Sequence, residues 1–140
     1  MKIDDNILID TNILVYQLNA DSEFYLFSKT IIEDNLGHIF VCQKSIAEWA
    51  AVLSKEGRYD IIEQEFNKII QKFKIIYTDD FSLGILYELL KKYKPSGNRV
   101  YDFEIVSVMI ANKIKKIVTI NVDDFKKIEE IEVISNKIEK

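Results

Sequence analysis

The stretch that decides the fold lies near the start of the chain and reads Ile7-Leu8-Ile9-Asp10-Thr11-Asn12-Ile13-Leu14-Val15-Tyr16. Its first residues are apolar without alternation, which is typical of a short buried strand, and we expect that strand to cover 6–9. Three polar residues follow it, and the apolar run at 13–16 then begins a helix. The stretch is therefore a strand that passes almost directly into a helix.

The rest of the chain repeats this alternation. Further strands are predicted at 38–42, 75–77, 117–120 and 132–134. Helices are predicted at 22–36, 45–56, 59–73, 79–93, 102–114 and 123–129. The clearest loop is Lys94-Pro95-Ser96-Gly97-Asn98. Short apolar strands that alternate with helices indicate an α/β fold with a mainly parallel central sheet and right-handed crossovers.

Acidic side chains follow several of these strands. In an open parallel α/β sheet, ligands bind outside the carboxyl ends of the strands, and this rule selects a few of the 23 acidic residues. Asp10 directly follows the first strand, and Glu48 lies in the first helical turns after the second. Asp102 lies where the loop at 94–101 enters a helix. The strand at 117–120 is followed by Asn121, Asp123 and Asp124.

Carboxylates gathered at one edge of a sheet need a partner, because two unit charges about 4 Å apart cost on the order of 4 kcal/mol at an effective dielectric of 20. A hard divalent ion with oxygen ligands is the natural partner, and magnesium takes one or two carboxylates plus phosphate oxygens. Other common metal and phosphate sites are missing from the sequence. His38 is the only histidine and Cys42 the only cysteine, and no glycine-rich phosphate loop is present.

Four segments, in this order, resemble the motifs of PIN domains. They are the stretch 7–16 quoted above, Ser45-Ile46-Ala47-Glu48-Trp49, Tyr101-Asp102-Phe103-Glu104-Ile105 with Ala111, and Val118-Thr119-Ile120-Asn121-Val122-Asp123-Asp124-Phe125. Each motif alone is weakly specific, but together they cover roughly residues 6–135. The compact size is similar to that of VapC-type toxins, the ribonuclease members of bacterial toxin–antitoxin pairs.

The resemblance implies a three-layer α/β/α sandwich and a metal-dependent endoribonuclease that hydrolyses RNA phosphodiester bonds with Mg²⁺ or Mn²⁺. It also implies a homodimer, and, for the toxin of a type II toxin–antitoxin pair, a cognate antitoxin that covers the site. Thr11 and Thr119 are expected to position a ligand carboxylate or a water by hydrogen bonding.

The resemblance also assigns roles to the acids. Asp10, Asp102 and Asp124 are expected to hold the metal, and Glu48 either ligates it or orients the attacking water. The fourth motif leaves alternatives open: Asp124 is preferred, Asp123 is second, and Asn121 ligates through its carbonyl or a water.

Composition sets the wider limits. The 140 residues, 48% apolar and 30% charged, fit one domain over 1–140. Cys42 lies in an apolar run and is expected to be a buried small hydrophobe. No signal peptide or stretch of about 18 apolar residues is apparent, so we expect a cytoplasmic protein without membrane contact. The net charge of −4 argues against binding nucleic acid by charge alone, but less against a metal nuclease, whose cation reverses the local sign.

Structural roles compete for the same residues. Asp10 and Asn12 are possible caps of the first helix, Asp102 of a later one, and Asp123 or Asp124 of the last. Ser45 to Glu48 is a capping-box pattern. Arg99 and Lys94 are candidates for steering RNA phosphate. Tyr16 and Trp49 are candidates for stacking a base, although core or dimer packing is the preferred interpretation.

Two other functions remain open at this stage. A phosphatase that resembles the haloacid-dehalogenase group would use Asp10 as nucleophile, but its usual second Asp is replaced here by Asn12. A non-catalytic binding module that keeps the PIN fold is the other alternative.

Overall fold

The centre of the protein is a parallel sheet, seen in a computed structural model that describes residues 1–136. Its strands are β1 (Ile7–Ile9), β2 (Ile39–Cys42), β3 (Lys74–Ile76), β4 (Lys116–Val118) and β5 (Glu132–Ile134). In these residues the sheet has five strands in the order β3-β2-β1-β4-β5, and each neighbouring pair is parallel. The prediction of an α/β fold with a mainly parallel sheet is confirmed. Residues 137–140 of the predicted single domain lie outside the described residues.

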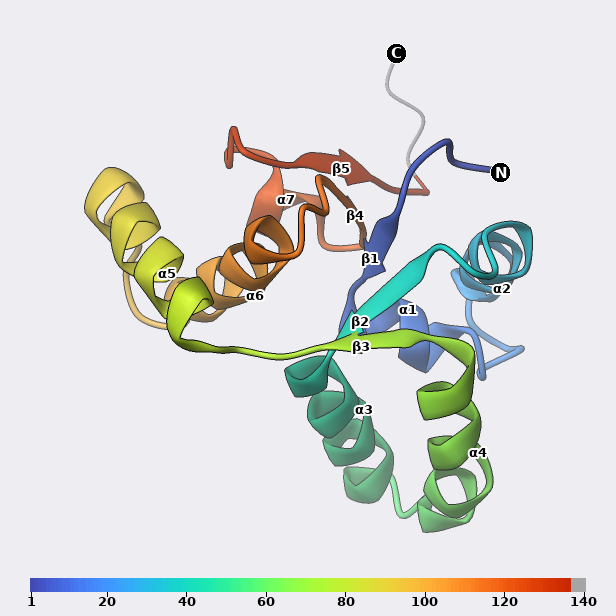
Figure 1. Ribbon diagram of the computed structural model, residues 1–140. Helices are drawn as coiled ribbons and strands as arrows, with labels where there is room; N and C mark the ends of the chain where they lie inside the picture. The colour runs from blue at the N-terminus through green and yellow to red at the C-terminus, as the bar shows by residue number, and fades with distance from the viewer. Residues whose placement is uncertain (137–140) are drawn as a thin grey trace.

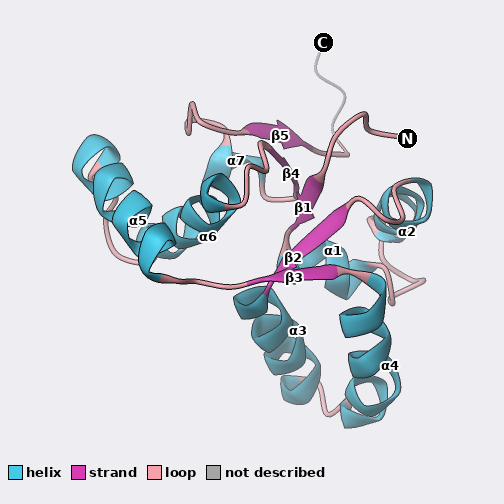
Figure 2. Ribbon diagram, in the orientation of Figure 1, coloured by secondary structure: helices cyan, strands magenta, loops and turns pink. Residues whose placement is uncertain are grey.

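Helices cover both faces of the sheet, which makes three layers (Figures 1 and 2). One face carries α1 (Thr11–Tyr16), α2 (Tyr25–Asp34), α3 (Gln43–Lys55) and α4 (Tyr59–Lys72). The other carries α5 (Asp80–Tyr93), α6 (Arg99–Ala111) and α7 (Val122–Phe125). Across residues 1–136, no helix combines the length and apolar character needed to cross a membrane.

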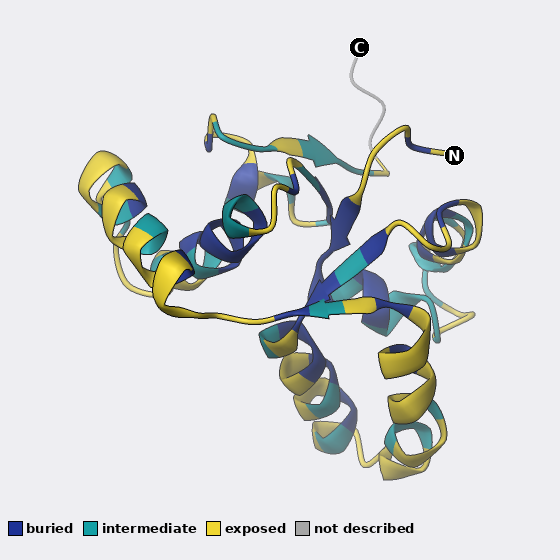
Figure 3. Ribbon diagram, viewed as in Figure 1, coloured by how far each residue is buried: buried dark blue, intermediate teal, exposed yellow. Residues whose placement is uncertain are grey.

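The two layers of helices enclose two apolar cores, and β1 contributes to both. Ile7 and Ile9 pack into the core under α1–α4, whereas Leu8 packs into the core under α5–α7. All three side chains are completely buried (Figure 3). Because successive residues of a strand point to opposite faces, a strand covered on both faces must be apolar throughout, which explains the unbroken run Ile7-Leu8-Ile9.

The strand order creates a switch point beside β1. The chain leaves β1 toward β2 and β3 and then crosses back, through α5 and α6, to add β4 on the other side of β1. Ile9 pairs with Val118, and the Asp10 backbone N–H donates to the Val118 carbonyl over 3.0 Å. Ligands of open α/β sheets bind at the carboxyl ends of strands beside such a switch point.

Several helix starts differ from the sequence prediction: α2, predicted from 22, begins at Tyr25, and the starts of α3 and α6 bear on the site. The helix predicted from 102 begins at Arg99, because consecutive turns with hydrogen bonds from Arg99 to Ser96 and from Val100 to Gly97 lead straight into it. Asp102 therefore lies inside the first turn and is not an N-cap.

The helix predicted from residue 45 begins at Gln43, with Cys42 as its N-cap. Ser45 is thus the third helical residue, and the capping-box interpretation of Ser45 and Glu48 is wrong. The last helix is shorter than predicted, and its N-cap is Asn121 rather than Asp123 or Asp124.

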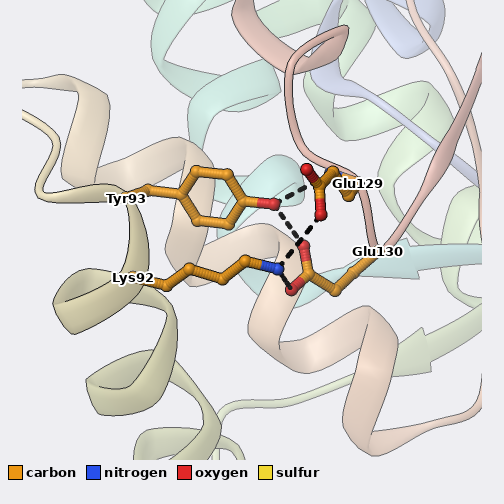
Figure 4. A network of polar contacts seen from close by, with 4 residues as sticks. All are labelled: Lys92, Tyr93, Glu129 and Glu130. Atoms are coloured by element: carbon orange, nitrogen blue, oxygen red, sulfur yellow. Dashed lines mark hydrogen bonds and ion pairs between the residues drawn. The ribbon is translucent and has the colours of Figure 1, made fainter.

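A polar network ties the end of α5 to the segment before β5 (Figure 4). The Tyr93 hydroxyl donates to Glu130 Oε1 over 2.6 Å and accepts from the Glu129 backbone N–H over 2.9 Å. Lys92 Nζ donates to both glutamates, at 2.9 and 3.3 Å. The Tyr93 ring also packs against Phe103 of α6, with 5.2 Å between ring centroids. The network thus supports the layer that carries Asp102.

We predict that the tyrosine matters more than the lysine in this network. Tyr93→Phe removes a short hydrogen bond to a charged group and should lower the free energy of unfolding by about 1–2 kcal/mol. Lys92→Met removes an ion pair whose lysine side chain is 49% exposed, and should lower the free energy of unfolding less than Tyr93→Phe does. Urea denaturation of both variants measures the difference. A larger loss for Lys92→Met would contradict this ranking.

Candidate active site

A cleft of about 360 Å³ opens at the carboxyl ends of β1 and β4. It is lined by Asp10, Thr11, Asn12, Val15, Tyr16, Glu48, Val52, Tyr101, Asp102, Ile105, Asn121 and Asp124. Five of the six site residues predicted from the sequence are in this set. The sixth, Asp123, does not line the cleft: its side chain is 84% exposed and lies 2.7 Å from Lys126 Nζ.

Asp10 is the most firmly held of the acids. It is the N-cap of α1, and its Oδ1 accepts a hydrogen bond from the Thr11 backbone N–H over 2.8 Å. Its Oδ2 accepts from the Thr119 hydroxyl over 2.8 Å and from the Asn12 amide over 3.3 Å. The predicted capping role and a place in the cleft therefore belong to the same side chain.

Asn12 and Thr119 fasten the loop after β1 to the loop after β4. The Asn12 amide nitrogen donates to Thr119 Oγ1 over 3.2 Å, and its oxygen accepts from the Ile120 backbone N–H over 3.2 Å. Thr119 Oγ1 also accepts from the Asn121 backbone N–H over 3.0 Å. Asn12 thus has a cross-linking role that sequence reasoning missed, since the spacing within one segment does not reveal a partner more than 100 residues away.

Glu48 reaches the cleft from α3. It lies in the second turn of α3, and its Oε2 accepts from the Thr11 hydroxyl over 3.4 Å. Lys44 lies one turn earlier on the same helix and forms an ion pair of 2.9 Å with Glu104 of α6. Sequence reasoning also missed Lys44, although the i,i+4 spacing to Glu48 places both residues on one face of a helix.

Arg99 joins the two remaining acids. Its Nε lies 3.5 Å from Asp102 Oδ2, and its Nη2 donates to the backbone carbonyl of Asp124 over 3.0 Å. The guanidinium thus holds the first turn of α6 against α7.

The acids of the cleft repel one another in a partly dehydrated setting. Burial raises the pKa of Asp10, and repulsion from Asp124 adds to this. Burial also raises the pKa of Glu48, which Lys44 partly counteracts. The pKa of Asp102 is raised to about 6, first by burial and then by the Asp124 charge, against the opposing effect of Arg99. The cleft therefore favours either protons or a bound cation.

The donor set fits a hydrated divalent ion. Within residues 1–136, no three acidic, histidine or cysteine side chains are close enough to form a complete coordination set. Magnesium does not require one, because it keeps several waters and takes one or two carboxylates directly. Since all the donors in the cleft are oxygens, Mg²⁺ or Mn²⁺ suits it better than zinc.

The two aromatic candidates and the cysteine have different locations in the structure. Trp49 is completely buried in the core under α1–α4, as the preferred core interpretation predicted. Tyr16 lines the cleft and packs on Phe24, with 5.0 Å between ring centroids. Cys42 is buried as expected, and burial raises its pKa to about 12, so its thiol stays protonated.

The raised pKa of Asp102 predicts a pH effect on stability. The folded state binds this proton more tightly than the unfolded chain, whose aspartate has a pKa of about 4. Stability without metal should therefore fall as pH rises from about 4 to about 6. Asp102 is partly solvated, so its contribution is moderate. Between pH 5 and pH 7 the wild type should lose about 1 kcal/mol more of its free energy of unfolding than Asp102→Asn does.

Urea unfolding in EDTA at the two pH values measures this effect. Asp123→Asn, which changes an acid outside the cleft, is the control and should keep the loss seen in the wild type. An equal loss in Asp102→Asn and the wild type would contradict the assignment.

Solved structures with the same fold come from several bacteria. A chain of the Rickettsia felis VapBC2 complex, crystallised with a fragment of promoter DNA, is 23% identical, with a TM-score of 0.67 and coverage of 92% of this chain and 97% of that one. A chain of a Klebsiella pneumoniae toxin–antitoxin complex is 20% identical, with a TM-score of 0.69 and coverage of 91% and 96%.

VapC20 of Mycobacterium tuberculosis, described as a toxin that cleaves the sarcin–ricin loop, is 12% identical, with a TM-score of 0.69 and coverage of 85% and 92%. At these identities the likeness concerns the fold. A comparison with curated proteins gave no significant match.

The sequence itself matches the family model of the PIN domain over residues 7–131, which includes all four predicted motifs. The fold and the model match agree, and the chain belongs to the PIN-domain family.

Proposed function

We propose that this protein is a metal-dependent endoribonuclease that hydrolyses RNA phosphodiester bonds in the carboxylate cleft. One observation carries the proposal: Asp10, Glu48, Asp102 and Asp124 come from four separate segments and line the same cleft. The raised pKa values of three of them reflect burial and mutual repulsion that a divalent cation would relieve. Membership of the PIN-domain family supports the same reaction class.

The position of each residue in the cleft indicates its proposed role. Asp10, Asp102 and Asp124 would hold Mg²⁺ or Mn²⁺, with Asn121 as a further oxygen donor at the rim. A divalent ion held by these residues would polarise the phosphoryl group and lower the pKa of a bound water. Glu48 lines the cleft from α3 and has a raised pKa, which suits a group that orients or deprotonates the attacking water. Thr11 and Thr119 keep the carboxylates of Glu48 and Asp10 in place.

The geometry favours this reaction over the two alternatives. A phosphatase of the haloacid-dehalogenase type has a second Asp two residues after its nucleophile, whereas this chain has Asn12 there, and the Asn12 amide bonds Thr119 and the Ile120 backbone. Detection of a covalent aspartyl-phosphate at Asp10 would support the phosphatase instead. A non-catalytic module has no need for four acids in one cleft, and calorimetry without any divalent-ion binding would support that alternative.

We also propose that the protein is the toxin of a type II toxin–antitoxin pair, acts as a homodimer and has a cognate antitoxin. The solved structures with this fold include toxin–antitoxin complexes and an RNA-cleaving toxin, which supports this assignment. A cytoplasmic location follows from the same proposal.

Replacement of Asp10 should abolish activity and leave the fold intact. Asp10→Asn keeps one acceptor oxygen, which the amide can turn toward Thr119 to retain the link between the loops after β1 and β4, and removes a charge that burial disfavours, so the protein should still fold. Cleavage of single-stranded RNA in Mg²⁺ should fall roughly a thousandfold, as expected when several kcal/mol of electrostatic stabilisation are lost. EDTA should abolish cleavage by the wild type. Wild-type rates in Asp10→Asn would end the proposal.

The adjacent acids of α7 provide a matched pair for the fourth ligand. Asp124→Asn should lose activity by a similar factor, because Asp124 lines the cleft. Asp123→Asn should keep it, because that carboxylate points to solvent and Lys126. Activity lost only in Asp123→Asn would reverse the assignment.

The toxin role predicts a phenotype in cells. Induced expression of the chain alone should arrest bacterial growth and produce cut RNA, and Asp10→Asn should do neither. Normal growth with abundant active wild-type enzyme would indicate a nuclease that is not a toxin.

A further inference from the structure

A second cavity lies next to the carboxylate cleft. It has a volume of about 270 Å³ and lies at the carboxyl ends of β2 and β3, where Cys42 and Ile76 line it. Gln43, Lys44, Thr78 and Glu104 contribute its polar groups. Ile105 of α6 lines both this cavity and the carboxylate cleft, so the two hollows adjoin at that residue.

An exposed tyrosine of the carboxylate cleft contacts a lysine of the second cavity. Tyr101 lines the carboxylate cleft, and 55% of its surface is exposed. Lys44, which lines the second cavity, places its Nζ 3.9 Å from the centroid of the Tyr101 ring and 2.9 Å from Glu104 Oε1. The lysine thus occupies one face of the ring and fixes its position, and the exposed surface of the ring remains available for a ligand.

Lys44 is also important for the charge of this region. Of the residues that line the two cavities, all within the described part of the chain, Lys44 alone has a positively charged side chain. Its charge acts on both Glu48 and Asp102, whose pKa values it lowers against the effect of burial. A polyanion that approaches the four carboxylates therefore meets favourable charge at this lysine, as well as at Arg99 beside Asp102.

We propose that Tyr101 and Lys44 form a subsite for one unpaired nucleotide of the RNA, next to the phosphodiester bond that is cleaved. The base stacks on the exposed surface of Tyr101, which lines the carboxylate cleft, and Lys44 offsets the repulsion between phosphate and carboxylates. The inference rests on the proposed ribonuclease function.

The subsite also predicts the class of RNA. A base inside a duplex is already stacked and paired and cannot lie on a protein ring unless it is extruded, whereas bases of loops and single strands stack readily on aromatic side chains. The substrate should therefore be unpaired at the nucleotide that contacts Tyr101.

The test replaces each base of the substrate in turn. A labelled single-stranded oligoribonucleotide that the wild type cleaves is synthesised with one abasic position at a time, and binding is measured by fluorescence anisotropy in the non-cleaving Asp10→Asn protein. One abasic position beside the cleavage site should weaken binding about tenfold, in the range of base–aromatic stacking. Adding Tyr101→Leu should weaken binding of the intact RNA by a similar factor and remove the difference at that position.

Two variants control for other effects. Tyr101→Phe keeps the ring and should restore binding and its dependence on that base. Tyr87→Leu removes another exposed tyrosine whose ring carries a lysine, Lys91 at 4.9 Å, but which lines neither cavity. It should bind like the parent protein.

The possible outcomes distinguish a failure of the proposed subsite from a failure of the proposed ribonuclease function. If the wild type cleaves RNA but no single abasic position matters, or Tyr101→Leu weakens all the abasic RNAs equally, the subsite is overturned and the proposed function stands. If the wild type neither binds nor cleaves RNA, the subsite and the proposed function are both overturned. In cleavage assays with the otherwise wild-type chain, Tyr101→Leu should raise KM about tenfold with a smaller change in kcat, and a loss confined to kcat would also overturn the subsite.

Discussion

The hydrogen bond from Thr119 to the buried carboxylate of Asp10 is the contact on which this structure depends most. It joins residues 109 positions apart, at the point where β1 and β4 end side by side. Asn12 reinforces it by bonding both partners and the Ile120 backbone. Since β1 contributes to both cores, this link fixes the cleft relative to the whole sheet. The same few atoms therefore close the fold at its switch point and place the first acid of the site.

The placement of that acid has an electrostatic consequence. Burying a carboxylate is unfavourable unless it is hydrogen-bonded or paired, and Asp10 has hydrogen bonds but no ion pair among the contacts of residues 1–136. Asp102 has a cation, Arg99, but only at 3.5 Å, and Lys44 is engaged by Glu104. The local positive charges thus neutralise the cleft incompletely. The residual negative charge weakens the folded state, and a bound cation would relieve it.

The sequence predicted the elements that periodicity and strand order control. The buried strands, the parallel sheet and the presence of Asp10, Glu48, Asp102 and Asp124 at one edge follow from apolar runs and from the rule that parallel strands end at a common edge. Helix starts were less predictable, because the turns at Ser96–Arg99 and the N-cap at Cys42 carry no capping side chain. The contact between Lys44 and Tyr101 was missed for another reason: it joins α3 to α6, and no local pattern encodes a pair 57 residues apart.

The carboxylates of the cleft differ in how firmly hydrogen bonds and ion pairs hold them, and this difference affects how a ligand would bind. Asp10 accepts hydrogen bonds on both oxygens, two of them at 2.8 Å, and is almost fully buried. Glu48 has one contact of 3.4 Å with Thr11, and Asp102 one of 3.5 Å with Arg99. A cation or phosphate that enters the cleft therefore meets a fixed ligand on the β1 side and more adjustable carboxylates on α3 and α6. Because no three acids are preassembled within residues 1–136, the adjustable side must complete the site. Affinity for the cation and for RNA should then be coupled, since each gains from the ordering of the same side chains.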